Sequence, residues 1–186
     1  LADVTISGNT AAWGGGMYLI ESNPTLTNVI IGGNTAGAYG GMYIHTSNPT
    51  LNHVTISRNT AEYGGGMYFY WYSNPTLTNS ILWGNVPDEI YFDESGSPSS
   101  VTIIYSDIQG SEAGIITNDN GTVSWLDGNI DVDPLFADPE NGDYTLQEGS
   151  PCIDAGIVIE DMEYCGSAPD MGAYEYCEEL SAASVT

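Results

Sequence analysis

The sequence predicts a parallel β-solenoid, an all-β fold in which short strands stack coil upon coil. From Leu1 onward, three consecutive segments of about 25 residues share one pattern, and a fourth begins at Leu77. The segments are rich in Gly, Asn, Thr, Val, Ile and Tyr, which favour strands and turns over helix. A segment this short cannot bury an apolar face alone, so neighbouring copies are expected to stack and share a continuous core.

Each coil is expected to hold two or three short strands, with equivalent residues of successive coils about 4.8 Å apart. This stacking predicts inward-facing columns of similar apolar side chains: Leu1, Leu26, Leu51 and Leu77; Ile6, Ile31, Ile56 and Leu82; and Met17, Met42 and Met67. Successive side chains of a strand point to opposite faces. The tyrosines that follow the methionines, Tyr18, Tyr43 and Tyr68, are therefore predicted to face outward.

Asparagines recur at two corners of the predicted coil. One set ends an apolar strand and the other precedes a proline: Asn9, Asn34, Asn59 and Asn85, and Asn23, Asn48 and Asn74. Asn tolerates left-handed backbone, and its amide both donates and accepts hydrogen bonds. We therefore expect the amides of the first set to bond to the same amide one coil away. A glycine triplet before the methionine marks a tight bend, and the middle copy has Tyr39 in the place of its first glycine.

The pattern divides the chain into three parts of one solenoid domain that spans residues 1–186. Regular repeats occupy 1–85, irregular coils and loops 86–140, and a C-terminal cap 141–186. No polar cap precedes the first repeat, although open solenoid ends are normally capped. We therefore expect the C-terminal part of a longer protein, or a subunit whose open end a partner covers. End-to-end stacking of copies into a filament is one form of that hypothesis.

Three cysteines, Cys152, Cys165 and Cys177, gather in the predicted cap. This clustering favours one disulfide that closes the cap in an oxidising compartment, with one thiol left over. A zinc site is disfavoured because the spacing does not suit paired ligands and the two histidines, His45 and His53, are distant. The sequence alone leaves the pairing of the three cysteines open.

The charge balance excludes several classes of partner. The chain has one Lys or Arg residue against 25 Asp and Glu residues, a formal net charge of −24. Binding to nucleic acid through phosphates needs clustered cations, and anionic lipid is disfavoured for the same reason. No stretch of the sequence is apolar for long enough to span a membrane, so we expect no membrane insertion.

The motifs resemble those of known surface proteins. ISGNTAAWGGGMY at Ile6 and ISRNTAEYGGGMY at Ile56 are similar to right-handed parallel β-helix repeats and to the repeats of polymorphic outer-membrane autotransporter adhesins. ILWGN at Ile81, VTIIYSDIQG, GNIDVDPLF, NGDYTLQEGSPCIDAG and DMGAYEY follow in that order. This series resembles the choice-of-anchor Q domain, a pectate-lyase-like β-helix followed by varied surface-anchoring signals. No anchor is recognisable in the nine residues after Cys177.

The resemblance implies a right-handed parallel β-helix that is secreted or displayed on the cell surface, and it supplies no agreed reaction. We expect a structural or adhesive module, non-catalytic, that recognises a polysaccharide or a cell-surface protein. The candidate ligand-binding residues are the outward tyrosines and a nearby aromatic cluster: Tyr18, Tyr43, Tyr68, Tyr70, Trp71 and Tyr72. Aromatic rows stack on sugar faces and anchor protein partners, although tyrosine ladders also stabilise a sheet by themselves.

Two further hypotheses concern catalysis and calcium. An acidic-polysaccharide lyase or hydrolase would draw on Arg58 and His53, since no other Arg or Lys is present. Arg58 also fits a simple corner substitution, because the other copies have glycine there. The acidic segment that starts at Asp127 alternates oxygen-bearing side chains, which suits a structural calcium ion. Its candidate ligands are Asp127, Asn129, Asp131 and Asp133, and no other cofactor is expected.

Overall fold

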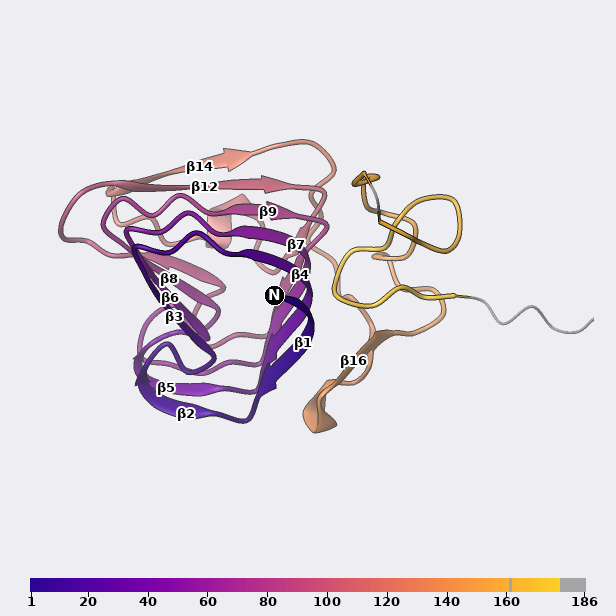
Figure 1. Cartoon of the computed structure of the whole chain (residues 1–186), viewed down its shortest axis with the longest axis horizontal. Coiled ribbons are helices and arrows are strands. Elements are labelled where there is room, and N and C mark those ends of the chain that lie inside the picture. Colours follow the sequence, from indigo (N-terminus) through magenta and orange to yellow (C-terminus); the bar gives the residue numbers. More distant parts are fainter. Residues whose placement is uncertain (161, 178–186) are drawn as a thin grey trace, which may run out of the picture.

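A computed structural model, which describes residues 1–160 and 162–177, contains a solenoid and a cap that packs along one of its sides (Figure 1). The chain winds through about five turns of about 25 residues each, with nearly all strands parallel. Strands of consecutive coils lie directly beside one another in Figure 1. The predicted all-β solenoid is therefore confirmed.

The largest sheet runs the length of the solenoid and carries the first strand of each coil. Its neighbours are hydrogen-bonded in the order β1 (Ala2–Ser7), β4 (Thr25–Gly32), β7 (Thr50–Ser57), β9 (Thr76–Thr78), β12 (Ser99–Ile104) and β14 (Gly121–Trp125), with β10 (Ile81–Trp83) and β13 (Asp107–Ile108) continuing from β7. Every pair in it is parallel. The register joins equivalent repeat positions, such as Leu26 with Leu51 and Ile31 with Ile56.

Smaller sheets complete each coil and the cap. The second sheet contains β3 (Met17–Ile20), β6 (Met42–His45), β8 (Met67–Tyr70) and β11 (Ile90–Phe92), all parallel. A third contains β2 (Thr10–Trp13) and β5 (Thr35–Tyr39). After the solenoid, β15 (Phe136–Asp138) and β16 (Asp143–Leu146) form an antiparallel pair. Two short 3₁₀ turns are η1 (Glu112–Gly114) and η2 (Pro139–Asn141).

The solenoid core consists of the predicted apolar columns. Leu26, Leu51 and Leu77 are fully buried, as are Met42 and Met67. The isoleucine column lies in the same core cluster, which explains why copies of one period are stable only when stacked. Leu1, the first member of the leucine column, is exposed, because no coil lies on its outer side in the structure.

The inner asparagine column forms the predicted ladder of amides. The Nδ2 of Asn9 donates to Oδ1 of Asn34, that of Asn34 to Asn59 and that of Asn59 to Asn85, at 2.9–3.0 Å. Each Oδ1 also accepts the backbone N–H of the preceding member. At the end of the ladder, the backbone N–H and Nδ2 of Asn85 both donate to the buried carboxylate of Glu89.

The cap has a small apolar core of its own that joins it to the largest sheet. Phe136, Tyr144, Cys152 and Met171 pack there against Ile30 and Ile81 of the solenoid. Tyr144 lies directly over Gly32, where a Cβ atom would sit only 2.6 Å from the tyrosine hydroxyl. Glycine at this position, between the serines of the neighbouring coils, therefore makes room for the cap.

A disulfide joins Cys165 to Cys177, with the two Cα atoms 5.4 Å apart. Cys152 is buried as a free thiol that donates to a carboxylate oxygen of Asp107. The expectation of one disulfide and one remaining thiol is therefore confirmed, and the structure supplies the pairing that the sequence left open. Burial raises the pKa of the Cys152 thiol, which keeps it protonated.

Candidate aromatic binding face

The second sheet and its flanks carry three parallel columns of aromatic side chains, which we call the aromatic face. The central column has one tyrosine on each strand of the second sheet: Tyr18 on β3, Tyr43 on β6, Tyr68 on β8 and Tyr91 on β11. The column on one side contains Trp13, Tyr39 and Tyr63. The column on the other side contains His45 and Tyr70, with Trp71 beside them. The solenoid repeat places them in register, because each residue pairs with its counterpart one coil away.

The rings of the central column stack along the solenoid. Tyr18 and Tyr43 have centroids 4.8 Å apart and planes within 9° of parallel. Tyr43 and Tyr68 are 5.8 Å apart, and Tyr68 and Tyr91 5.4 Å, again nearly parallel. Such offset stacks stabilise a pair by about 0.5–1.5 kcal/mol beyond the area they bury. The rings of the central column therefore form one continuous stack along the sheet.

The prediction that Tyr18, Tyr43 and Tyr68 are all exposed on the outer face is wrong for Tyr43 and Tyr68. Tyr43 and Tyr68 alternate with inward methionines as predicted, yet only 7% and 3% of their surfaces are exposed. The flanking columns cover them, since Tyr39 packs on Tyr43 at 5.5 Å and on Tyr68 at 4.2 Å. Tyr70 lies 6.4 Å from Tyr43 on the other side. These two tyrosines support the face, and Tyr18 remains exposed.

The column of Trp13, Tyr39 and Tyr63 could not be aligned from the sequence because the strand register shifts by one residue. The sequence places Tyr39 opposite the first glycine of the other copies, whereas in the structure it pairs with Trp13 across an irregularity between β2 and β5. Tyr63 continues the same column. An aromatic residue directly before each run of glycines was the signal that could have revealed it. Trp13 is 52% exposed and forms the most accessible ring of this flank.

The extra residue of the third repeat produces the other accessible edge of the face. Trp71 and Tyr72 both have positive φ angles, 39° and 50°, so they form a tight turn after β8. This turn leaves Trp71 43% and Tyr72 58% exposed. Trp71 still stacks on Tyr70 at 5.6 Å, which connects the turn to the rest of the face. The predicted cluster of Tyr70, Trp71 and Tyr72 is thus brought together at one corner.

Carboxylates lie among the rings. Asp93, directly after β11, accepts the hydroxyl hydrogen bond of Tyr68 and also two bonds from Ser95. Burial, together with this bond, raises the pKa of Tyr68, and burial raises that of Tyr43. Glu62 precedes Tyr63 and its charge raises the pKa of the Tyr63 hydroxyl. The hydroxyls of Tyr43, Tyr63 and Tyr68 therefore stay protonated.

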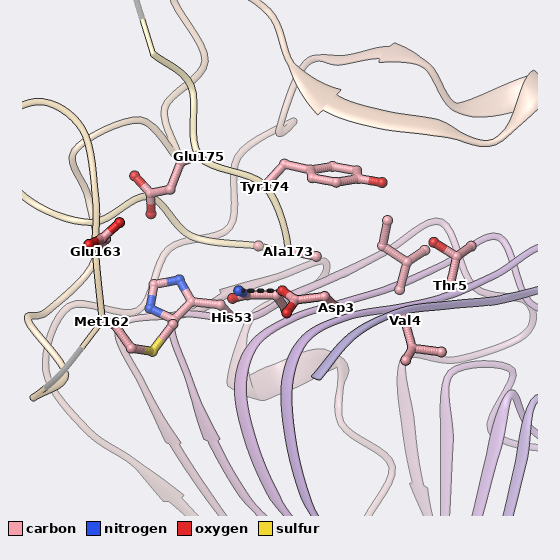
Figure 2. A pocket seen from close by; sticks show the side chains of 12 residues that line it. Asp3, Val4, Thr5, His53, Met162, Glu163, Ala173, Tyr174 and Glu175 are labelled. Atoms are coloured by element: carbon pink, nitrogen blue, oxygen red, sulfur yellow. Dashed lines mark hydrogen bonds between the residues drawn. The ribbon is translucent and has the colours of Figure 1, made fainter. Parts of the chain in front are cut away.

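His53 lies in a different place, beneath the cap (Figure 2). A cavity of about 290 Å³ separates the first coils from the cap, and Figure 2 shows Met162 and Glu163 of the cap facing His53 and Asp3 of the solenoid. The His53 ring is buried and its Nε2 lies 2.9 Å from the amide nitrogen of Asn79. Burial lowers the pKa of His53, so its imidazole is neutral at physiological pH.

Arg58 occupies a corner with left-handed backbone, φ 57°, where the other copies have glycine. Its guanidinium forms an ion pair with Glu140 at 2.5 Å. It lines a cavity with Trp83 and Pro139, whereas His53 lines the cavity beneath the cap. The two candidate catalytic residues therefore do not share one cavity in the structure.

The four candidate calcium ligands lie in the last coil and the segment after it. Asn129 Oδ1 accepts the backbone N–H of Ser106, and Asp131 Oδ1 that of Gly110. The Oδ1 of Asp133 accepts the backbone N–H of Leu135 two residues later, and Asp127 is exposed. Within residues 1–160 and 162–177, no three His, Cys, Asp or Glu side chains are grouped to hold a metal ion. Calcium at this segment stays a prediction.

Comparison with known proteins identifies the fold family. A family model described as a right-handed beta helix region matches residues 2–133, more than half of the chain. The chain therefore belongs to the right-handed β-helix family, and the match ends just before the cap begins. No curated protein and no solved structure gives a significant match. In the described part of the chain, no helix is long and apolar enough to cross a membrane.

Proposed function

We propose that the protein is an extracellular β-helix module that binds carbohydrate through the aromatic face and does not cleave it. The observation that carries this proposal is the continuity of the face, in which ring contacts connect Trp13 at one edge to Trp71 at the other. Aromatic rings offer flat apolar surfaces with polar tips, and such surfaces suit the apolar faces of sugar rings.

The rigidity of the scaffold supports this role. Tyr43 and Tyr68 are buried above a core that contains fully buried methionines, and Tyr43 stacks on the exposed Tyr18. Such contacts restrict side-chain freedom before binding, and preorganised surfaces bind more tightly for that reason. A linear polymer could lie along the columns, since each coil repeats the same kind of contact.

The location outside the cell rests on separate support. A disulfide closes the cap, and disulfides persist in oxidising compartments. β-Helix family membership and the resemblance to choice-of-anchor Q domains and autotransporter adhesins point in the same direction. Attachment to a surface and adhesion to a surface protein stay proposals of the same kind. End-to-end self-association also stays a prediction, which size-exclusion chromatography tests.

The lyase or hydrolase alternative has less support. Arg58 is paired with Glu140, and His53 lies under the cap with its Nε2 bonded to an amide. A base that removes a proton from an acidic sugar must reach the substrate, and these two residues line separate cavities. No observation places either beside the exposed rings.

Affinity electrophoresis through gels that contain different polysaccharides tests the proposal. Binding retards the wild-type protein, and Trp13→Ala or Trp71→Ala restores free migration in the same gel. Tyr164→Ala, a comparably exposed aromatic residue of the cap, serves as the matched control and should stay retarded. A cleared zone around the band would show cleavage and contradict the proposal. Equal migration of all variants in every gel would remove the aromatic face as the binding site.

A further inference from the structure

We propose that the ligand of the aromatic face is an amino-sugar polymer with free amines, a carbohydrate that carries positive charge. This inference rests on the proposed function, because it names the class of carbohydrate that the same face takes. Two independent features of the face lead to it: the distribution of carboxylates at its edges and the absence of cations that could compete with a bound amine.

Carboxylates lie at three edges of the face. Glu21 directly follows β3, Glu62 directly precedes Tyr63, and Asp93 directly follows β11. Glu21 and Glu62 are exposed, and Asp93 is partly so. The charge of Glu62 raises the pKa of the Tyr63 hydroxyl, and burial, together with the hydrogen bond to Asp93 and its charge, raises that of Tyr68. The edges of the face therefore carry negative charge, with one exposed carboxylate directly beside the partly exposed ring of Tyr63.

Cations are missing from the same surface. The whole chain has a single Lys or Arg, which is Arg58, and the Glu140 carboxylate neutralises it at a cavity of the cap side. Among the described residues of the aromatic face, only His45 is basic. An acidic sugar would meet carboxylates without a compensating charge, and like charges at an interface cost several kcal/mol. Uronic-acid polymers are therefore poor ligands for this face.

An ammonium group fits both kinds of side chain present. The face of an aromatic ring carries negative charge density and attracts a cation within about 6 Å, most strongly for Trp. Trp13 and Trp71 are the exposed tryptophans of the two edges. A sugar ring stacked on either places a free amine where the ring quadrupole attracts it, and the carboxylates at the edges of the face add a longer-range attraction. Neutral sugars obtain only the stacking part of this interaction.

The test uses short soluble ligands, because a protein of this net charge attracts any long polycation. The probes are a glucosamine tetramer with free amines and the same tetramer fully N-acetylated, titrated calorimetrically at physiological ionic strength. We expect the free amine form to bind about tenfold more tightly, the size of an exposed to partly desolvated cation–π contact. Trp13→Ala, which leaves the net charge unchanged, should remove most of this preference.

A pair of charge variants separates a local effect from the overall charge. Glu62→Gln and Glu148→Gln remove one exposed carboxylate each, and Glu148 lies in the cap beside a different cavity. We expect Glu62→Gln to bind the free-amine tetramer more weakly than the wild type, and Glu148→Gln to bind it with wild-type affinity. Equal losses would show attraction to overall charge and would overturn the inference. Equal affinity for both tetramers, lost in Trp13→Ala, would overturn the inference and leave the proposed function standing. A lysine tetrapeptide that binds more tightly than either sugar would assign the face to a basic protein partner instead.

Discussion

Replacement of Asn59 by alanine tests the asparagine ladder that holds the coils in register. The Asn59 side chain is fully buried and takes part in four hydrogen bonds. Its Nδ2 donates to the Asn85 amide oxygen at 2.9 Å and to the Ile31 carbonyl at 2.8 Å. Its Oδ1 accepts the backbone N–H and the Nδ2 of Asn34, both at 3.0 Å.

The magnitude follows from the donors that lose their acceptor. Without Oδ1 of Asn59, the backbone N–H of the buried Asn34 and one hydrogen of its amide have no partner. An unsatisfied buried donor costs about 1–3 kcal/mol, so the free energy of unfolding should fall by about 2–6 kcal/mol. Asn48, at the exposed outer corner, is the matched control, because it loses only the bond from Asn74. Asn48→Ala should cost about 1 kcal/mol or less.

Urea unfolding followed by tyrosine and tryptophan fluorescence measures both values, with the slope checked to confirm a common unfolded state. The expected result is a much lower midpoint for Asn59→Ala than for Asn48→Ala. Similar midpoints would contradict this prediction, since they would show that the buried amides contribute no more to stability than those at the surface.

Three further outcomes follow from the structure. Tyr43→Ala should lower the free energy of unfolding by about 3–5 kcal/mol, because it removes a buried ring. Tyr72→Ala, which removes an exposed ring, should lower it by less than about 1 kcal/mol. Equal losses of stability in urea unfolding would contradict the burial of Tyr43. Burial raises the pKa of Glu89 to about 7, so folding favours the protonated form of this carboxyl group. The protonated group therefore adds about 3 kcal/mol to the free energy of unfolding below its ordinary pKa near 4.5, and this contribution is lost as the pH rises toward 7. Urea midpoints across that range should decline in the wild type and decline less in Glu89→Gln, and parallel slopes would be inconsistent with this role. Intact mass spectrometry should find two hydrogens fewer than in the fully reduced chain, and Cys165→Ser should destabilise the cap by about 3 kcal/mol, as expected for the loop closed at Cys177; an unchanged melting curve would argue against it.

The fold could be predicted because the same sequence pattern recurs several times along the chain. Leucine, isoleucine and methionine at fixed spacing can be buried together only if the coils stack in register. The asparagine ladder followed from the same argument, since an amide that donates and accepts suits a column of identical neighbours. Glu89 was not predicted as its end, because it lies outside the repeat and only the irregular coil brings it under Asn85.

The site was less predictable because exposure depends on neighbours that the period does not describe. Strand alternation gave the direction of Tyr43 correctly, yet its burial depends on Tyr39, which a register shift of one residue brings opposite Trp13. The contact of Tyr144 with Gly32 was equally hidden, since it joins the non-repeating cap to the solenoid. Sequence patterns reveal contacts between repeats, whereas contacts between a repeat and a unique segment require the structure.

The most direct test of the central claim, binding without cleavage, follows the polymer as well as the protein. The protein is incubated with an insoluble, uncharged polymer of N-acetylated amino sugars, the bound protein is sedimented, and the chain length of the polymer is measured before and after. We predict that the wild-type protein co-sediments, that a Trp13→Ala, Trp71→Ala double variant stays in the supernatant, and that the chain length is unchanged. Shortened chains, or equal sedimentation of the double variant, would contradict it.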